Sequence, residues 1–180
     1  MGVEESHRVG PMRRVSAFVI DLSIVAVWAA IAGLVALALG WIGVRFETAA
    51  SRDALAFVTL ILPVTLTFAY QEAGPRQATF GKRRMGLVVV DRRGNSLAPG
   101  RSLARSALKL LPWQLGHSAV FRLVADADSV AWLIVSLVAQ AIVMVSLSKV
   151  VLGAHGRALH DVVAGTRVVA ERPTAEHWVT

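Results

Sequence analysis

The chain has 180 residues, of which 55% are hydrophobic and 17% charged, and 19 basic against 12 acidic side chains give a net charge of +7. Soluble domains carry about a quarter charged residues, so this composition excludes a disordered chain and argues against an ordinary soluble enzyme. The basic excess favours an anionic lipid surface over nucleic acid as a partner, and the absence of cysteine excludes disulfides, thiolate catalysis and cysteine metal sites.

The first apolar run covers residues 15–44 and contains one charge, Asp21. At about 1.5 Å per residue it is roughly 45 Å long, more than the ~30 Å hydrocarbon core of a bilayer. A signal peptide has an apolar region of only about 7–15 residues followed by a small-residue cleavage site, which is missing here. The run therefore predicts a retained transmembrane helix over about 14–44.

Two further runs are long enough to span a bilayer. Residues 54–70 predict a helix over about 54–71, and Pro63 within it is tolerated where neighbours satisfy the freed backbone. Residues 130–152 predict the last helix, in which Lys149 lies close enough to the end to reach the interface.

The stretch 101–124 is also predicted to be helical, but it carries charge. Arg101, Arg105 and Lys109 follow an i, i+4, i+8 spacing and form one basic helical face. This pattern fits an amphipathic helix on an anionic membrane surface, or a polar helix sheltered inside a bundle.

Loop charge decides the topology. The 71–102 loop carries seven basic and two acidic residues, which places it in the cytoplasm by the positive-inside rule. The basic tail, residues 153–180, returns to that side if 101–124 also crosses. We therefore predict an all-α membrane protein: one domain over 1–180, four membrane-embedded helices and both termini cytoplasmic.

Two short β-branched runs, 87–90 and 166–170, predict strands on the cytoplasmic side. Two lone strands are not stable in water, so we expect them to pair with each other as a small two-strand element against the helices.

Three motifs carry a family resemblance: RVSAFVID from Arg14, TFGKRRMGLVVVD from Thr79, and LHDVVAGTRVV from Leu159. Together they resemble the RDD family of bacterial integral membrane proteins, named for one arginine and two aspartates, here Arg14, Asp21 and Asp161. Members often read Gly-Gln-Thr before the Gly-Lys pair, whereas this chain reads Gln-Ala-Thr at 77–79. The resemblance implies a small helical protein of the bacterial plasma membrane. Cation/proton exchange has been proposed for some members, and others stand beside or fused to unrelated domains, as accessory proteins do.

Asp21 is the most informative candidate because intramembrane carboxylates face the bundle interior and often mark ion or proton paths. Its functional interpretation is a cation or proton site. Its structural interpretation is a buried pair with a basic side chain or a backbone donor; the basic candidates are Arg105, which comes first, Lys109 and Arg122.

Asp161 follows His160, and His155 precedes both, but this pattern is weak as a metal site. We expect Asp161 to cap a helix or to pair with Lys82, Arg83 or Arg84. The basic side chains are expected to pair or to contact lipid headgroups: Lys82, Arg83, Arg84, Arg101, Arg105 and Lys109. No metal or cofactor motif is present.

The sequence carries no motif of an enzyme active site, so no catalysis is expected. It predicts an accessory or scaffold subunit that packs against a larger membrane complex, with a cation/proton transporter using Asp21 as the alternative. The expected partners are a bilayer with anionic headgroups and a membrane protein or a second copy, not nucleic acid.

Overall fold

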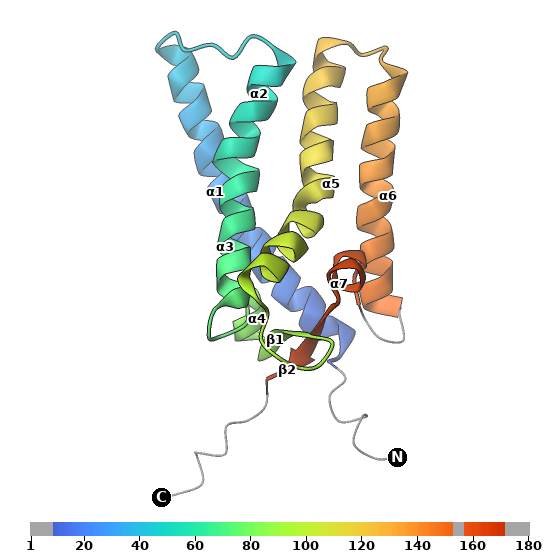
Figure 1. Ribbon diagram of the computed structural model, residues 1–180. Helices are drawn as coiled ribbons and strands as arrows, with labels where there is room; N and C mark the ends of the chain where they lie inside the picture. The colour runs from blue at the N-terminus through green and yellow to red at the C-terminus, as the bar shows by residue number, and fades with distance from the viewer. Residues whose placement is uncertain (1–8, 153–156, 172–180) are drawn as a thin grey trace, which may run out of the picture.

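The computed structural model describes residues 9–152 and 157–171, and these are mostly helical (Figure 1). The long helices are α1 (Pro11–Trp41), a continuous helix over Ala49–Ala73, α5 (Pro99–Ala125) and α6 (Val130–Leu152). The continuous helix consists of α2 (Ala49–Ala56), the π-helical turn η2 (Phe57–Ile61) and α3 (Leu62–Ala73). The short elements are α4 (Phe80–Arg84), β1 (Leu87–Asp91), α7 (Leu159–Ala164) and β2 (Thr166–Ala170).

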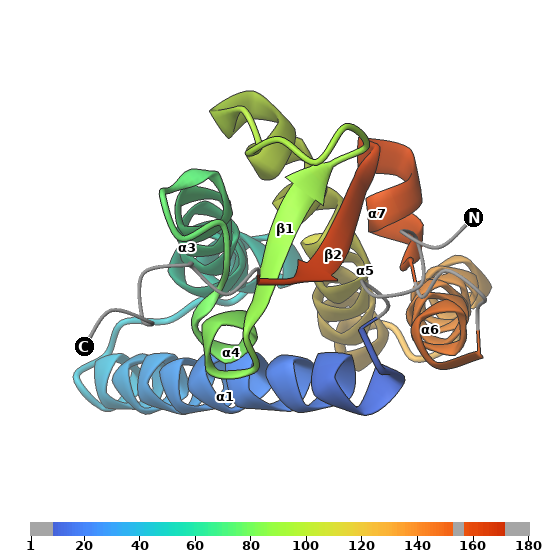
Figure 2. The ribbon, with the colours of Figure 1, turned by 90° about the horizontal axis from the view of Figure 1, so that it is seen from below.

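The elements are arranged with two distinct ends. Figure 1 shows α4, β1, β2 and α7 together at one end of the long helices, here called the sheet end. The connections α1–α2 and α5–α6 lie at the opposite end, the loop end. Seen from below, α1 runs obliquely across the helices that are viewed end-on (Figure 2). Helix α1 therefore packs against α4 and α6 in its first half and against η2 near its middle, where Trp28 reaches Thr59.

Among the described residues, three helices are long and apolar enough to cross a membrane: Pro11–Trp41, Ala49–Ala73 and Val130–Leu152. The expected count of four spans is thus supported for three. Helix α5 is long enough but more polar, and it packs between α3 and α6 rather than lying apart from them (Figure 1). It also contains Pro112, and the helix is visibly bent, as expected where a proline removes a backbone hydrogen bond.

The π-helical turn η2 precedes Pro63. Proline has no N–H, so the carbonyl of Thr59, four residues earlier, loses its helical donor. The indole N–H of Trp28 on α1 donates to this carbonyl at 2.8 Å. The proline is therefore tolerated within an apolar helix because a neighbouring helix satisfies the freed backbone group.

The two predicted strands pair with each other. β1 and β2 are antiparallel, with Val88 opposite Val169 and Val89 opposite Val168. Of the predicted tail 153–180, the structure describes residues 157–171, which contain α7 and β2, and the rest lies outside the described residues.

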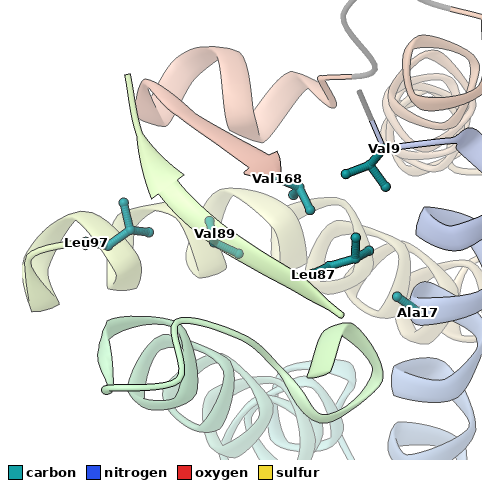
Figure 3. Close-up of a cluster of buried hydrophobic side chains, with 6 residues drawn as sticks. All are labelled: Val9, Ala17, Leu87, Val89, Leu97 and Val168. Atoms are coloured by element: carbon teal, nitrogen blue, oxygen red, sulfur yellow. The ribbon is translucent and has the colours of Figure 1, made fainter. Parts of the chain in front are cut away.

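The sheet covers a small apolar core at the sheet end (Figure 3). Figure 3 shows its buried side chains, which come from the segment before α1, from α1, from both strands and from the segment after β1: Val9, Ala17, Leu87, Val89, Leu97 and Val168. A two-stranded ribbon is not stable alone in water, and here the apolar core covers one of its faces. The strand pair is thereby attached to α1.

Much of the apolar surface of the long helices remains exposed in the single chain. None of the most apolar 18-residue window of α1 is buried, and only 6% of that of α6. Large apolar side chains cover these faces, as in helices that contact lipid or another membrane helix. The fold therefore combines a packed sheet end with apolar outer faces.

Candidate functional site

Four charged side chains and one hydroxyl are buried together at the sheet end. They come from α3, α4, α5, α7 and β2, respectively, and form the ionic cluster: Glu72, Lys82, Arg105, Asp161 and Thr166. Glu72 accepts from Lys82 Nζ at 2.6 Å and from Arg105 Nη1 at 2.5 Å. Arg105 Nε donates to Asp161 Oδ1 at 2.9 Å, and Thr166 Oγ1 donates to the same oxygen at 2.9 Å. The cluster thus links five elements through side chains.

Because these ion pairs are buried, the loss of either partner would strongly destabilise the fold. Arg105 is 2% exposed and Glu72 is fully buried. Charges in such a place are tolerated only when they are paired and hydrogen-bonded, and removing one partner leaves the other uncompensated. With two acids and two bases, the cluster is balanced.

The α7 side chains show the effect of this environment on protonation. Burial acts to raise the pKa of Asp161, but the charge of Arg105 and the hydrogen bonds from Arg105 and Thr166 bring it below its usual range. Burial lowers the pKa of the neighbouring His160 to about 3, so its imidazole is neutral at pH 7. Asp161 therefore carries its negative charge at neutral pH.

Asp21 lies beside the cluster and caps helix α4. Its Oδ1 accepts from the Gly81 N–H at 2.7 Å, and its Oδ2 accepts from Thr79 Oγ1 at 2.6 Å. A carboxylate at this position is favoured because the first N–H groups of a helix have no helical acceptor. A Cβ at Gly81 would clash with the Ala17 carbonyl oxygen and crowd the Asp21 carboxylate. The glycine in the TFGKRR motif is thus explained by the close approach of α4 to α1.

Two predicted pairings are wrong, and one alternative is confirmed. Asp21 does not pair with Arg105. It accepts a hydrogen bond from the backbone N–H of Gly81, and a backbone donor was the alternative expected for a structural Asp21. Asp161 does not cap α7, whose N-cap is Ala158, and it does not pair with Lys82, Arg83 or Arg84; it pairs with Arg105. The reason is tertiary: Glu72 on α3 and Asp161 on α7 reach Arg105, and Glu72 also holds Lys82.

The remaining basic candidates are not brought into the cluster. Arg14 Nη2 donates to the Val168 carbonyl at 3.0 Å and so joins α1 to β2. Arg83 lies over the Phe80 ring at 5.8 Å, Arg84 is exposed, and Arg101 is half exposed at 3.6 Å from Asp91. The expected basic face of Arg101, Arg105 and Lys109 is therefore split, because Arg105 is buried among acids.

Glu72, Thr79 and Thr166 were not predicted as site residues. Glu72 follows an apolar helix directly, and an acid at such a helix end is a signal that could have identified it. The two threonines have no comparable signal, because their importance depends on the acids that other elements bring to them.

A cavity of about 210 Å³ opens beside the cluster, between α1, α5, α6 and α7. Its polar wall includes Arg14, Asp21 and Lys109, and its apolar wall is formed mainly by α6. Among the described residues, no group of three or more acids or histidines is arranged to hold a metal ion, and His155 lies outside them.

A second polar group lies toward the loop end. Asp53 on α2 accepts from Gln114, Ser118 and Arg122 on α5 at 2.8–3.0 Å. Arg122, considered above as a partner for Asp21, is thus engaged elsewhere. Buried apolar side chains lie between the two polar groups along η2, α3 and α5: Ile61, Val64 and Leu110, respectively.

The model of the RDD family matches residues 8–165. No curated protein and no solved structure matches the chain.

Proposed function

The chain belongs to the RDD family, and we propose that it is an accessory or scaffold subunit of the bacterial plasma membrane that packs against a larger membrane complex. It is a membrane protein with helices long and apolar enough to span a bilayer. The proposal depends on the surface that its loop end leaves uncovered.

The observation that carries the proposal is the groove between the second half of α1 and α2. It has a volume of about 900 Å³ and is also lined by η2, by Phe121 of α5 and by charged side chains near the α1–α2 connection: Arg45, Glu47 and Arg52. The side of α1 that faces it consists largely of small residues: Ala29, Ala32, Gly33, Ala36 and Gly40. Small residues allow two helix backbones to approach closely in a membrane, where packing drives association. We assign the groove to a transmembrane helix of the partner complex.

Gly33→Leu tests this assignment. A Cβ at Gly33 meets no atom within 4 Å, so the variant should fold normally while its side chain obstructs the groove. Gly116→Leu on α5 is the matched control, because its Cβ also meets open space and it does not line the groove. We expect native purification with quantitative mass spectrometry to recover one membrane protein at constant stoichiometry with the wild type and Gly116→Leu, but not with Gly33→Leu. A clean homo-oligomer, or equal recovery with both variants, would contradict the proposal.

Cation/proton exchange is a second candidate because Asp21 lines the cavity near the sheet end. Two features weigh against it. Both Asp21 oxygens are engaged by Thr79 and Gly81, and apolar side chains separate the sheet-end polar groups from Asp53. The test is cation/proton exchange in proteoliposomes. Exchange by the wild type that is retained in Asp91→Asn but lost in a folded Asp21→Asn variant would favour transport over the accessory role.

We also propose that the sheet end is cytoplasmic and that α5 is a fourth crossing. The sheet-end loops are rich in arginine, whereas the α5–α6 connection carries Asp126 and Asp128. A reporter fused after Thr180 should behave as cytoplasmic and one inserted beside Asp126 as external. If the reporter after Thr180 behaves as external, α5 does not cross the membrane.

The same proposal includes no catalytic activity, no cofactor and no nucleic-acid partner. The basic residues beside the apolar helices suit an anionic membrane surface, where each contributes roughly 1 kcal/mol.

A further inference from the structure

We propose that the cavity between α1, α5, α6 and α7 binds the headgroup of an anionic phospholipid, with Lys109 as the cation that receives the phosphate. This inference does not depend on the accessory role. The cavity has charged side chains on one wall and aliphatic side chains on the other, which matches an amphiphile with an anionic end.

Lys109 is distinguished from its charged neighbours by its contacts. Lys82 and Arg105 are held by acids of the ionic cluster, and Asp21 accepts from Gly81 and Thr79. Among the described residues, Lys109 has no carboxylate within salt-bridge distance; its Nζ lies 4.2 Å from the centre of the Phe68 ring. Lys109 lines the cavity, and its ammonium, which contacts the Phe68 ring on α3, can turn to donate to an incoming anion.

The opposite wall supplies the apolar contacts. It is formed by α6 side chains, with Phe18 from α1: Ile142, Val143, Leu147 and Val150. From Ile142 to the last α6 residue, Leu152, is ten residues, or roughly 15 Å at 1.5 Å per residue. The cavity therefore extends from the end of an apolar helix toward its middle, the depth over which a phospholipid changes from headgroup to acyl chain.

The volume limits what enters. The cavity has a volume of about 210 Å³. This accommodates a phosphate and the carbons next to it but not a whole lipid. The acyl chains would lie outside, along the exposed apolar faces of α1 and α6.

The test measures lipid binding to the full-length protein in detergent by native mass spectrometry and thermal shift. The probes are phosphatidylglycerol, phosphatidylcholine and inorganic phosphate. We expect phosphatidylglycerol to bind preferentially and to raise Tm. Lys109→Gln should weaken its binding roughly tenfold or more, because a hydrogen bond between charged groups is lost. The matched control is Lys149→Gln, a lysine that is exposed on α6 and does not line the cavity; it should bind like the wild type.

A second variant keeps the proposal testable if Lys109→Gln is poorly folded. Ser146→Phe fills the cavity from α6, away from the ionic cluster, and should reduce phosphatidylglycerol binding without changing the charged wall. Equal binding of the two phospholipids, or equal effects of Lys109→Gln and Lys149→Gln, would overturn the proposal. Inorganic phosphate that binds as well as the lipid would overturn the lipid assignment and indicate a site for a free anion.

Discussion

The sheet end and the loop end of the bundle are held together in different ways. At the sheet end, seven elements meet over an apolar core and the ionic cluster, and the acids of that cluster have basic partners. At the loop end, the second half of α1 borders a groove of about 900 Å³, and the polar group around Asp53 is partly exposed. The contrast indicates that the sheet end specifies the fold, while the loop end leaves helix surface uncovered.

Removing the centre of the ionic cluster should produce the largest effect. Arg105→Met leaves Asp161 buried without its basic partner and Glu72 with Lys82 alone. We expect unfolding in detergent to become easier by about 3–5 kcal/mol. The exposed neighbour Arg101→Met should change stability by less than about 1 kcal/mol. Equal losses in the two variants would mean that the cluster does not specify the fold.

Gly81→Ala should have the next largest effect. The added methyl meets the Ala17 backbone and the Asp21 carboxylate, so α4 must move away from α1. The expected loss is about 1–3 kcal/mol, as for overpacked sites. Gly116→Ala, whose Cβ meets open space, should be neutral or slightly stabilising. A thermal melt of both variants measures the difference.

Asp21→Asn should cost less, about 1–2 kcal/mol. The amide keeps one oxygen to accept from Gly81, but the charge that favours a helix N-terminus is lost. Because the partners of Asp21 are neutral donors, neutralising Arg105 in the same chain should not restore stability. Rescue of Asp21→Asn by Arg105→Met in a double-mutant cycle would show that the two side chains are coupled after all.

Mild acid should weaken the sheet end through His160. Its folded pKa of about 3 lies below its ordinary value of 6.5, so the unfolded chain takes up a proton that the fold does not. The free energy of unfolding should therefore decrease as pH falls below about 6.5, by at most ~1.4 kcal/mol per pH unit until about pH 3. His160→Gln should flatten this dependence between pH 7 and 5. An unchanged slope would show that His160 is not the titrating group.

The smallest effect is expected at the loop end. Asp53→Asn removes the charge from a pair in which Arg122 is 28% exposed, and solvent weakens such pairs. We expect a loss of up to about 1 kcal/mol in the same melt. A loss as large as that of Arg105→Met would erase the distinction between the two ends.

The sequence by itself determined the helices and the strand pair. The apolar runs and the β-branched runs are local patterns, so the helix bounds lie within a few residues of the expected ones, except that the second helix begins at Ala49 rather than near 54. The pairing of the two strands with each other followed because two lone strands are not stable in water, whereas their antiparallel direction is a finding of the structure.

Only the tertiary structure decided which charges meet. Arg105 lies 33 positions from Glu72 and 56 positions from Asp161 in the sequence. No spacing rule predicts which acid pairs with a buried arginine over such separations. The choice follows from the bent α5, which brings Arg105 between α3 and α7, and from Gly81, which lets α4 approach α1 closely enough for Asp21 to cap it. A sequence allows many pairings of its charged side chains. A buried charge without a partner is strongly destabilising, so only a fold in which the buried charges are paired is stable.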